Sequence, residues 1–218
     1  FNPRKERHRA SNIESLLFDP LAEYDPVDVS FIPVLAESWS FSPSGDTLEI
    51  TLHDDYTWHE VTMDGTTIGG QPIGAEDLKR QLVLDEEFRA DYWEVVSEIT
   101  VSGTHTVRIE FTESVNKSVL KFDVLQQRLN HPPTYFDDRG QEASTISPSD
   151  GRPPVGSGPF KFETATHETV TLAAADGHPS SGQSEISRVV FEFHDSESEQ
   201  WAALADREVS GSGEAFFP

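Results

Sequence analysis

The sequence contains no cysteine among its 218 residues. Disulfide frameworks, thiol nucleophiles, zinc-thiolate sites and iron–sulfur clusters are therefore excluded. Long apolar runs are also missing, because the longest cover only a few residues, such as 189–191, whereas a helix that spans a bilayer needs about 20. We therefore expect no transmembrane helix. The chain opens at Phe1 without a charged and then apolar leader, so we expect that any export signal is already absent.

Positive charge is scarce. The chain has 16 Lys and Arg against 39 Asp and Glu, which gives a net charge of −23. A chain this acidic repels phosphate backbones, whose binding requires clustered cations, so nucleic acid is excluded as a partner. Only five of the cations are lysines. Because dispersed carboxylates stay hydrated where salt screens their repulsion, we interpret this surface as that of a halophile. The alternative is an ordinary acidic mesophilic surface.

Aromatic residues are plentiful by contrast. The chain has 4 Trp, 4 Tyr and 14 Phe, which is too many for a disordered acidic tail. Its length corresponds to about one and a half domains of roughly 150 residues each. We therefore expect a folded chain with a sizeable buried core.

Periodicity predicts the elements of the first part of the chain. Strict alternation of apolar and polar residues at 47–52 and 106–111 predicts two half-buried strands. The inward residues would be Leu48, Ile50, Leu52, Val107, Ile109 and Phe111. Helices are predicted at 75–88 and 117–129, and the residues 60–74, which are rich in Gly and Thr, predict a loop or hairpin.

The later part begins with a breaker-rich passage at 131–159, in which 147–154 is the best candidate for a domain boundary. Strands are predicted at 160–162, 169–172 and 188–193, followed by a capping box at Ser196 to Glu199 and a short helix. Strands interleaved with helices indicate an α/β or mixed α+β fold. The two lobes of such a fold would meet near residue 153.

The patterns that carry chemistry are weak in this chain. Gly156-Ser157-Gly158 is followed by Pro159 instead of a helix start, so we interpret it as a tight turn in which glycines permit positive φ, and not as a phosphate loop. The eight histidines lack the helical spacing that aims two at one metal, and no Gly-x-Ser-x-Gly elbow occurs. His59 and Glu60 are adjacent and would point to opposite faces of an extended chain. We therefore expect no enzyme, no metal site and no cofactor.

The tryptophans divide into two groups. Trp39, Trp58 and Trp201 lie in patterned segments, where core positions are more common than ligand platforms. Tyr92 and Trp93 follow the predicted helix in a polar stretch, so one of these rings is a candidate to line a cleft.

Several stretches together resemble one family, the extracellular solute-binding proteins of the oligopeptide/dipeptide type (family 5) that serve ABC importers. The stretches occur in family order across nearly the whole chain. They are Asn2-Pro3 with 13–21, the signature PVLAESW at 33–39 with SPSG at 42–45, TLHDDYTWH at 51–59, GAEDL at 74–78, VGSGPFKF at 155–162 and WAALADREV at 201–209. The chain departs from the family pattern after His59, where a longer loop replaces an immediate Asp-Gly.

The resemblance implies a periplasmic-binding-protein-like type II lobe with an inserted smaller subdomain. It assigns 1–33 and 153–218 to lobe I and 34–152 to the inserted subdomain. Family members are more than twice as long, so the resemblance implies a truncated chain whose second lobe is absent. It also maps the cleft onto two places, Glu6, Arg7 and His8 before the first helix, and Tyr92 and Trp93 after the second. Arg7 is suited to pair with a carboxylate, and an aromatic ring to cover a side chain.

The function that the resemblance implies is capture of an oligopeptide or related small solute on the extracellular face of the membrane, and its delivery to ABC permease subunits. The protein would be a monomer, held at the membrane by an anchor or partner that this sequence does not contain. A non-peptide solute such as a nickel chelate or a sugar is one alternative, because fold and signature do not fix the ligand. A hydrolase with a cryptic site and a purely structural acidic surface domain are two others.

Overall fold

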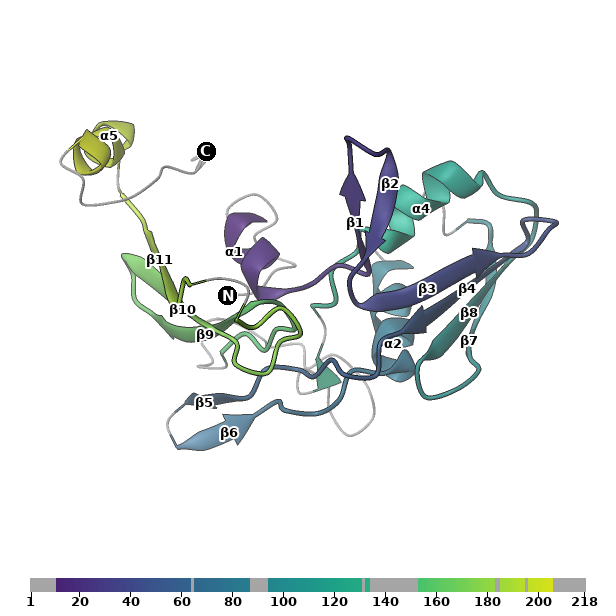
Figure 1. Ribbon diagram of the computed structural model, residues 1–218, viewed down its shortest axis with the longest axis horizontal. Coiled ribbons are helices and arrows are strands. Elements are labelled where there is room, and N and C mark those ends of the chain that lie inside the picture. Colours follow the sequence, from purple (N-terminus) through teal and green to yellow (C-terminus); the bar gives the residue numbers. More distant parts are fainter. Residues whose placement is uncertain are drawn as a thin grey trace.

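The computed structural model describes residues 11–63, 65–86, 94–130, 132–133, 153–182, 185–194 and 196–205. Figure 1 shows how their helices and strands are arranged. Their buried apolar side chains form two hydrophobic cores of unequal size. In chain order the elements are α1 (Ser11–Leu17), β1 (Ala22–Asp25), β2 (Ser30–Pro33), β3 (Ala36–Phe41), β4 (Thr47–Leu52), β5 (Val61–Met63), β6 (Thr66–Ile68), α2 (Ala75–Glu86), β7 (Val96–Val101), β8 (Thr106–Phe111), α4 (Lys117–Leu125), β9 (Phe160–Ala165), β10 (Thr169–Ala174), β11 (Arg188–Glu192) and α5 (Glu197–Ala205).

The larger sheet has the strand order β3-β4-β8-β7, and all of its pairings are antiparallel. The inward residues predicted by alternation are confirmed, since each is at most 6% exposed: Leu48, Ile50, Leu52, Val107, Ile109 and Phe111. Thr47 was expected on the outer face and is buried as well. The preceding turn folds over it, and the Ser42 hydroxyl accepts a hydrogen bond from the Thr47 N–H at 3.2 Å.

Two helices complete the larger core. Helix α2 contacts β7 and β8 and buries Leu78 and Leu82 fully. Helix α4 starts after Asn116, whose side-chain oxygen accepts hydrogen bonds from the first backbone N–H groups of the helix. The predicted helix at 75–88 is confirmed to Glu86, and its last two positions lie outside the described residues.

The helix predicted at 117–129 ends earlier, at Leu125. The backbone beyond it bonds instead to the segment that joins α1 to β1. The Leu21 N–H donates to the carbonyl oxygen of Gln127 at 3.1 Å, and the Leu129 N–H donates to that of Asp19 at 3.2 Å. Because these bonds require an extended chain, tertiary contacts override the helical pattern here.

The smaller core lies where α1 packs against β9 of the antiparallel sheet β11-β10-β9. Its buried members are Ile13, Leu17, Phe18, Phe160 and Leu172. The three strands predicted for this region are confirmed as β9, β10 and β11, with ends that shift by a few residues. One half of the predicted capping box is confirmed, because the Ser196 hydroxyl accepts a hydrogen bond from the Glu199 N–H at 3.3 Å.

The tryptophans follow the prediction only in the larger core. Trp58 is 1% exposed, and Trp39 packs against the same core. Trp201 is 57% exposed, so its predicted core position is wrong. Its helix α5 stands beyond β11, at the end of the molecule away from the larger sheet (Figure 1). Among the described side chains of that helix only Ala203 is buried.

The region 60–74 forms the hairpin that was one of its two predicted states. Strands β5 and β6 pair across a turn in which Gly65 has φ of 78°. Most of the predicted boundary at 147–154 lies outside the described residues. No helix in the described ranges is both long enough and apolar enough to cross a bilayer. The mixed α/β composition agrees with the predicted fold class.

Candidate functional site

Two chain segments far apart in sequence cross between the cores, and we call residues 17–19 and 156–158 the junction. The backbone N–H groups of Ser157 and Gly158 both donate to the Leu17 carbonyl oxygen, at 2.9 and 2.8 Å. A Cβ at Gly156 would lie 2.0 Å from that oxygen, and one at Gly158 would lie 2.6 Å from the Leu16 carbonyl oxygen. Glycine is required here by close backbone approach.

That finding corrects the expectation for this turn. Neither Gly156 nor Gly158 has a positive φ, whereas Gly45, Gly69 and Gly70 do. A tight turn was predicted here, but the backbone has no turn at Gly156 and Ser157 and bends only at Gly158 and Pro159. The reason given for the glycines was also wrong.

His59 fastens one side of the junction. Its backbone N–H donates to the Gly156 carbonyl oxygen at 2.7 Å, and its ring Nε2 lies 2.7 Å from the Gly158 carbonyl oxygen. Because a carbonyl only accepts, Nε2 carries the proton. Burial lowers the pKa of His59 to about 4, the Gly158 carbonyl raises it, and His178 and Lys161 lower it further. The ring is therefore neutral at pH 7, and its Nδ1 is buried without a hydrogen-bond partner.

The other side of the junction is fastened by a buried carboxylate–imidazole pair. Asp19 Oδ2 lies 2.6 Å from His178 Nε2, and both side chains are less than 10% exposed. The Asp19 N–H donates to the Ser157 hydroxyl at 3.2 Å, which ties this pair to the crossing segments. The Tyr56 ring meets His178 edge-on, at 5.5 Å between centroids. Burial, followed by the charges of Asp19 and Asp55, raises the pKa of Tyr56 to about 12, so its hydroxyl keeps its proton.

The side chains of Asp19, His178 and Ser180 contact one another in that order, and they are the residue types of a hydrolase triad. The Ser180 hydroxyl lies 2.7 Å from His178 Nδ1. However, the Ser180 backbone N–H also donates to that nitrogen, at 3.1 Å and from only two residues away. This geometry is typical of a side chain that closes a local turn, so the contacts describe a brace rather than an activated nucleophile.

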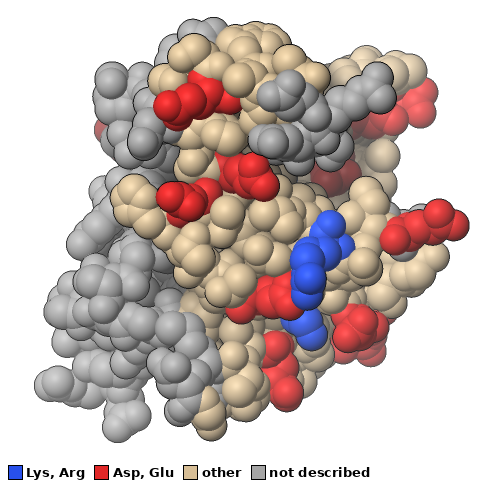
Figure 2. All heavy atoms as spheres, turned by 90° about the vertical axis from the view of Figure 1, so that its left-hand side faces the viewer, with Lys and Arg blue, Asp and Glu red and all other residues tan. Residues whose placement is uncertain are grey.

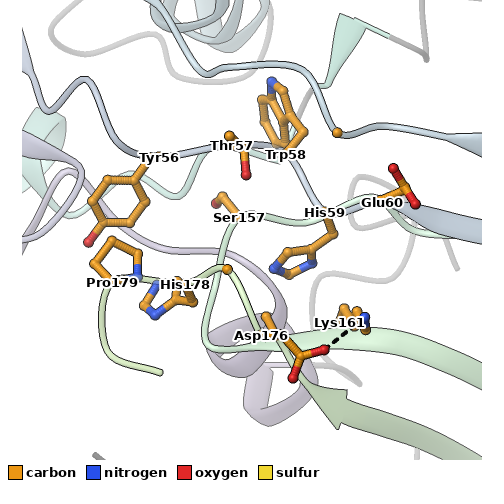
Figure 3. A pocket seen from close by; sticks show the side chains of 13 residues that line it. Tyr56, Thr57, Trp58, His59, Glu60, Ser157, Lys161, Asp176, His178 and Pro179 are labelled. Atoms are coloured by element: carbon orange, nitrogen blue, oxygen red, sulfur yellow. Dashed lines mark ion pairs between the residues drawn. The ribbon is translucent and has the colours of Figure 1, made fainter. Parts of the chain in front are cut away.

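An open pocket of about 290 Å³ lies beside the junction. Its lining is Tyr56, Thr57, Trp58, His59, Glu60, Gly70, Ser157, Lys161, Ala175, Asp176, Gly177, His178 and Pro179. The close view shows His59 and Ser157 at its centre, with the ion pair of Lys161 and Asp176 beside them (Figure 3). That pair is loose, with 3.9 Å between Lys161 Nζ and Asp176 Oδ2. As alternation predicted, His59 is buried while Glu60 is exposed.

The residues predicted to line a ligand cleft are not among those that the structure places. Glu6, Arg7, His8, Tyr92 and Trp93 all lie outside the described residues. The pocket is lined instead by residues that were not predicted to bind a ligand. Among them, His59 and Glu60 were considered only as an adjacent pair, and Ser157 only as part of a turn. His178 carried no signal because its partner Asp19 lies 159 positions away. No group of three potential metal ligands gathers within the described parts of the chain.

Comparison with known proteins supplies a family. The model of the bacterial extracellular solute-binding proteins, family 5 (middle region), matches residues 30–215. The nickel-binding periplasmic protein of Escherichia coli (strain K12) is 28% identical over 149 residues, which are 67% of this chain and 26% of that protein.

Solved structures agree on the fold. A putative peptide-binding protein AppA from Clostridium difficile has a TM-score of 0.70 and 24% identity, with 96% of this chain and 42% of that chain covered. NikZ from Campylobacter jejuni, in complex with Ni(L-His), has a TM-score of 0.69 and 22% identity, covering 89% and 37%. The periplasmic-binding-protein-like fold class is thereby confirmed. The chain spans about a quarter of the curated relative's length and about two fifths of these structures.

Proposed function

Since this chain belongs to the bacterial extracellular solute-binding proteins of family 5, we propose that it is part of the substrate-binding component of an ABC importer. It captures a peptide or a related small solute outside the cell and delivers it to the permease subunits. The match of the family model to residues 30–215 is the observation that carries this proposal. We further propose that the protein is a monomer without enzymatic activity and that it acts on the extracellular face of the membrane.

We propose that these residues supply lobe I, as 1–33 and 153–218, and the inserted subdomain 34–152. The separation of the two cores supports this division, because the smaller core unites residues 13–18 with 160–172. The larger core already includes Leu21 and Ala22, so a crossing point near residue 20 fits the packing better than one near residue 33. A second lobe, contributed by the longer parent protein, closes over the ligand.

The test is a thermal-shift scan of the full-length parent protein, with residues 1–218 alongside. The ligands are a mixture of tri- to pentapeptides and, separately, nickel with L-histidine. A rise in Tm with peptides for the parent alone supports a peptide binder whose second lobe completes the site. A rise with the nickel complex alone favours the second candidate, for which the names of the Escherichia coli relative and of the Campylobacter jejuni complex argue. No shift with either ligand contradicts both candidates.

Glu6, Arg7, His8, Tyr92 and Trp93 remain our proposed ligand contacts. Arg7→Ala and Trp93→Ala in the parent protein should each weaken ligand binding by about tenfold or more, because each removes a charge pair or a stacking face. Arg108→Ala is the matched control, since Arg108 is exposed on β8 and pairs with Glu110 on the same strand. Equal affinities for all three variants would contradict the assignment.

We also propose that the acidic surface is an adaptation to salt. Among the described residues of one face, Figure 2 shows Asp and Glu side chains at several separate places and Lys and Arg side chains gathered at one. Salt screens the repulsion within a chain of net charge −23. The Tm should therefore rise between dilute buffer and molar KCl. A flat or falling Tm would contradict the proposal.

A further inference from the structure

We propose that the pocket beside the junction binds a small zwitterion, an α-amino acid, whose carboxylate meets Lys161 and whose ammonium meets the carboxylates of Glu60 and Asp176. This inference concerns the pocket that the structure describes, and it goes beyond the proposed function, whose predicted cleft residues lie outside the described residues. Either proposal can fail without the other.

The Lys161 ammonium has hydrogen-bonding capacity to offer. Its side chain on β9 is 35% exposed, and its ion-pair partner Asp176 is 3.9 Å away, which is beyond hydrogen-bond distance. Asp176 itself is 95% exposed and is therefore free to swing toward solvent or a ligand. The ammonium carries three donors. A carboxylate that enters the pocket would find a cation whose donors are not already used by short protein contacts.

The balance of charge around the pocket selects the kind of ligand. Lys161 is the positive side chain of the lining, Glu60 and Asp176 are the negative ones, and the two imidazoles are His59 and His178. His59 is neutral at pH 7 because burial lowers its pKa to about 4. A simple anion would gain Lys161 and be repelled by both rim carboxylates. A simple cation would gain the two exposed carboxylates but be repelled by Lys161. A zwitterion whose ammonium and carboxylate are attached to the same carbon atom gains from both sets.

Size and position also fit a small ligand. The volume of about 290 Å³ lies at the lower end of the range of ligand pockets, about 300 to 1,000 Å³. Tyr56 and Trp58 belong to the larger core, whereas Lys161 and Asp176 come from the side of the smaller core. An amino acid bound between them would contact both sides of the junction and stabilise their packing against each other.

The experiment uses three probes that share one carbon skeleton but differ in charge: L-alanine, propionate, which lacks the ammonium, and L-alaninamide, which lacks the carboxylate. Each is titrated into the full-length parent protein labelled with ¹⁵N in histidine, and the imidazole resonances of His59 and His178 are followed. L-Alanine should shift both resonances in a saturable way, with an affinity at least about tenfold tighter than either analogue. Equal responses to all three probes, or none, would overturn the proposal.

Variants connect the response to the pocket. Lys161→Met keeps the length of the side chain and removes its charge, and Glu60→Gln removes one ammonium partner at an exposed position. Each should weaken L-alanine binding by about tenfold, whereas Lys121→Met on α4 should leave it unchanged. Because Glu60 is exposed, its variant provides a test even if Lys161→Met fails to fold. Unchanged affinity in Glu60→Gln and in a folded Lys161→Met would place the amino acid elsewhere and overturn the proposal.

Discussion

The two cores of this chain differ in how completely they are closed. Within the described residues the larger core buries 22 side chains, drawn from Leu21 through to Val155, and the smaller core buries five. Two helices contribute to the larger core. The smaller sheet ends in β11. Val190 within this strand is 50% exposed, and Phe193 just after it is 40% exposed. The larger core is therefore a self-sufficient unit, while the smaller one depends on its attachment through the junction.

We therefore expect the largest loss of stability from adding a single side-chain atom, a Cβ, at the junction. Gly156→Ala would put a Cβ 2.0 Å from the Leu17 carbonyl oxygen and 3.0 Å from His59 Nδ1. Because backbone must move, we expect the free energy of unfolding to fall by about 4 kcal/mol. The measurement is urea unfolding followed by tryptophan fluorescence.

Gly177→Ala is the matched control, because a Cβ at Gly177 would meet nothing within 4 Å. Its free energy of unfolding should stay within about 0.5 kcal/mol of that of the unsubstituted chain. Similar midpoints for the two variants would mean that the crossing of the segments does not hold the cores together.

The next comparison cuts an equivalent cavity in each core. Leu48 and Leu172 are both fully buried, the first in β4 of the larger sheet and the second in β10 of the smaller. Leu48→Ala should cost about 3 to 4 kcal/mol, because its surroundings are held on all sides and relax little. Leu172→Ala should cost about 2 kcal/mol, because a thin core collapses more readily into the space. Urea unfolding measures both, and a larger loss for Leu172→Ala would reverse our ranking of the cores.

Predictability differed between the strands and the junction. Strands β4 and β8 were predictable because a period of two is a local property, and their inward faces are buried as expected. The junction was not predictable from local pattern. It depends on pairs such as His59 with Gly158 and Asp19 with His178, which lie 99 and 159 residues apart.

Two errors show the physical reason. The local interpretation of Gly156 invoked backbone conformation, whereas the constraint is a carbonyl oxygen 139 positions earlier. Trp201 was assigned to a core by the pattern of its own helix, but its side chain is 57% exposed. A side chain is buried only if a second surface exists, and a sequence pattern describes one surface at a time. The proposed cleft residues remain predictions.

Acid should act on the junction through His59. Its pKa is lowered from the ordinary 6.5 to about 4, so the unfolded chain takes up this proton first as the pH falls. The free energy of unfolding should therefore decrease from about pH 6.5 down to about pH 4, and then level off. The total loss from this group should be at most about 3 kcal/mol, on the order of magnitude that such a shift implies.

Carboxylates titrate in the same range, so the effect is read as a difference between variants. His59→Gln retains an N–H donor for the Gly158 carbonyl and cannot take up the proton, so it should flatten the pH dependence. His167→Gln, at an exposed position after β9, should leave it unchanged. Urea midpoints at pH 7, 5.5 and 4 provide the measurement. If the urea midpoints of the unsubstituted chain and of His59→Gln changed in parallel with pH, this role of His59 would be contradicted.

The smallest expected effect comes from removing the caps of α4 and α5. The two losses should differ in whether the helix opens together with a core or by itself. Asn116 caps α4, which buries Leu120, Val124 and Leu125 in the larger core. Ser196 caps α5, whose Trp201 is exposed. Replacing either cap by alanine removes about 1 kcal/mol of helix stability. Asn116→Ala should lower the global unfolding midpoint, because α4 cannot open without exposing the core.

Ser196→Ala should instead leave the midpoint unchanged and speed amide hydrogen exchange within α5 alone, because that helix can open by itself. Exchange followed residue by residue distinguishes the two responses. Ser198→Ala is the control, because the Ser198 hydroxyl contacts the Ser196 hydroxyl at 3.1 Å and is not the acceptor of the Glu199 N–H. A shift of the global midpoint in Ser196→Ala would show that α5 unfolds together with the larger core. In that event the exposure of α5 would not make this helix a separate unfolding unit.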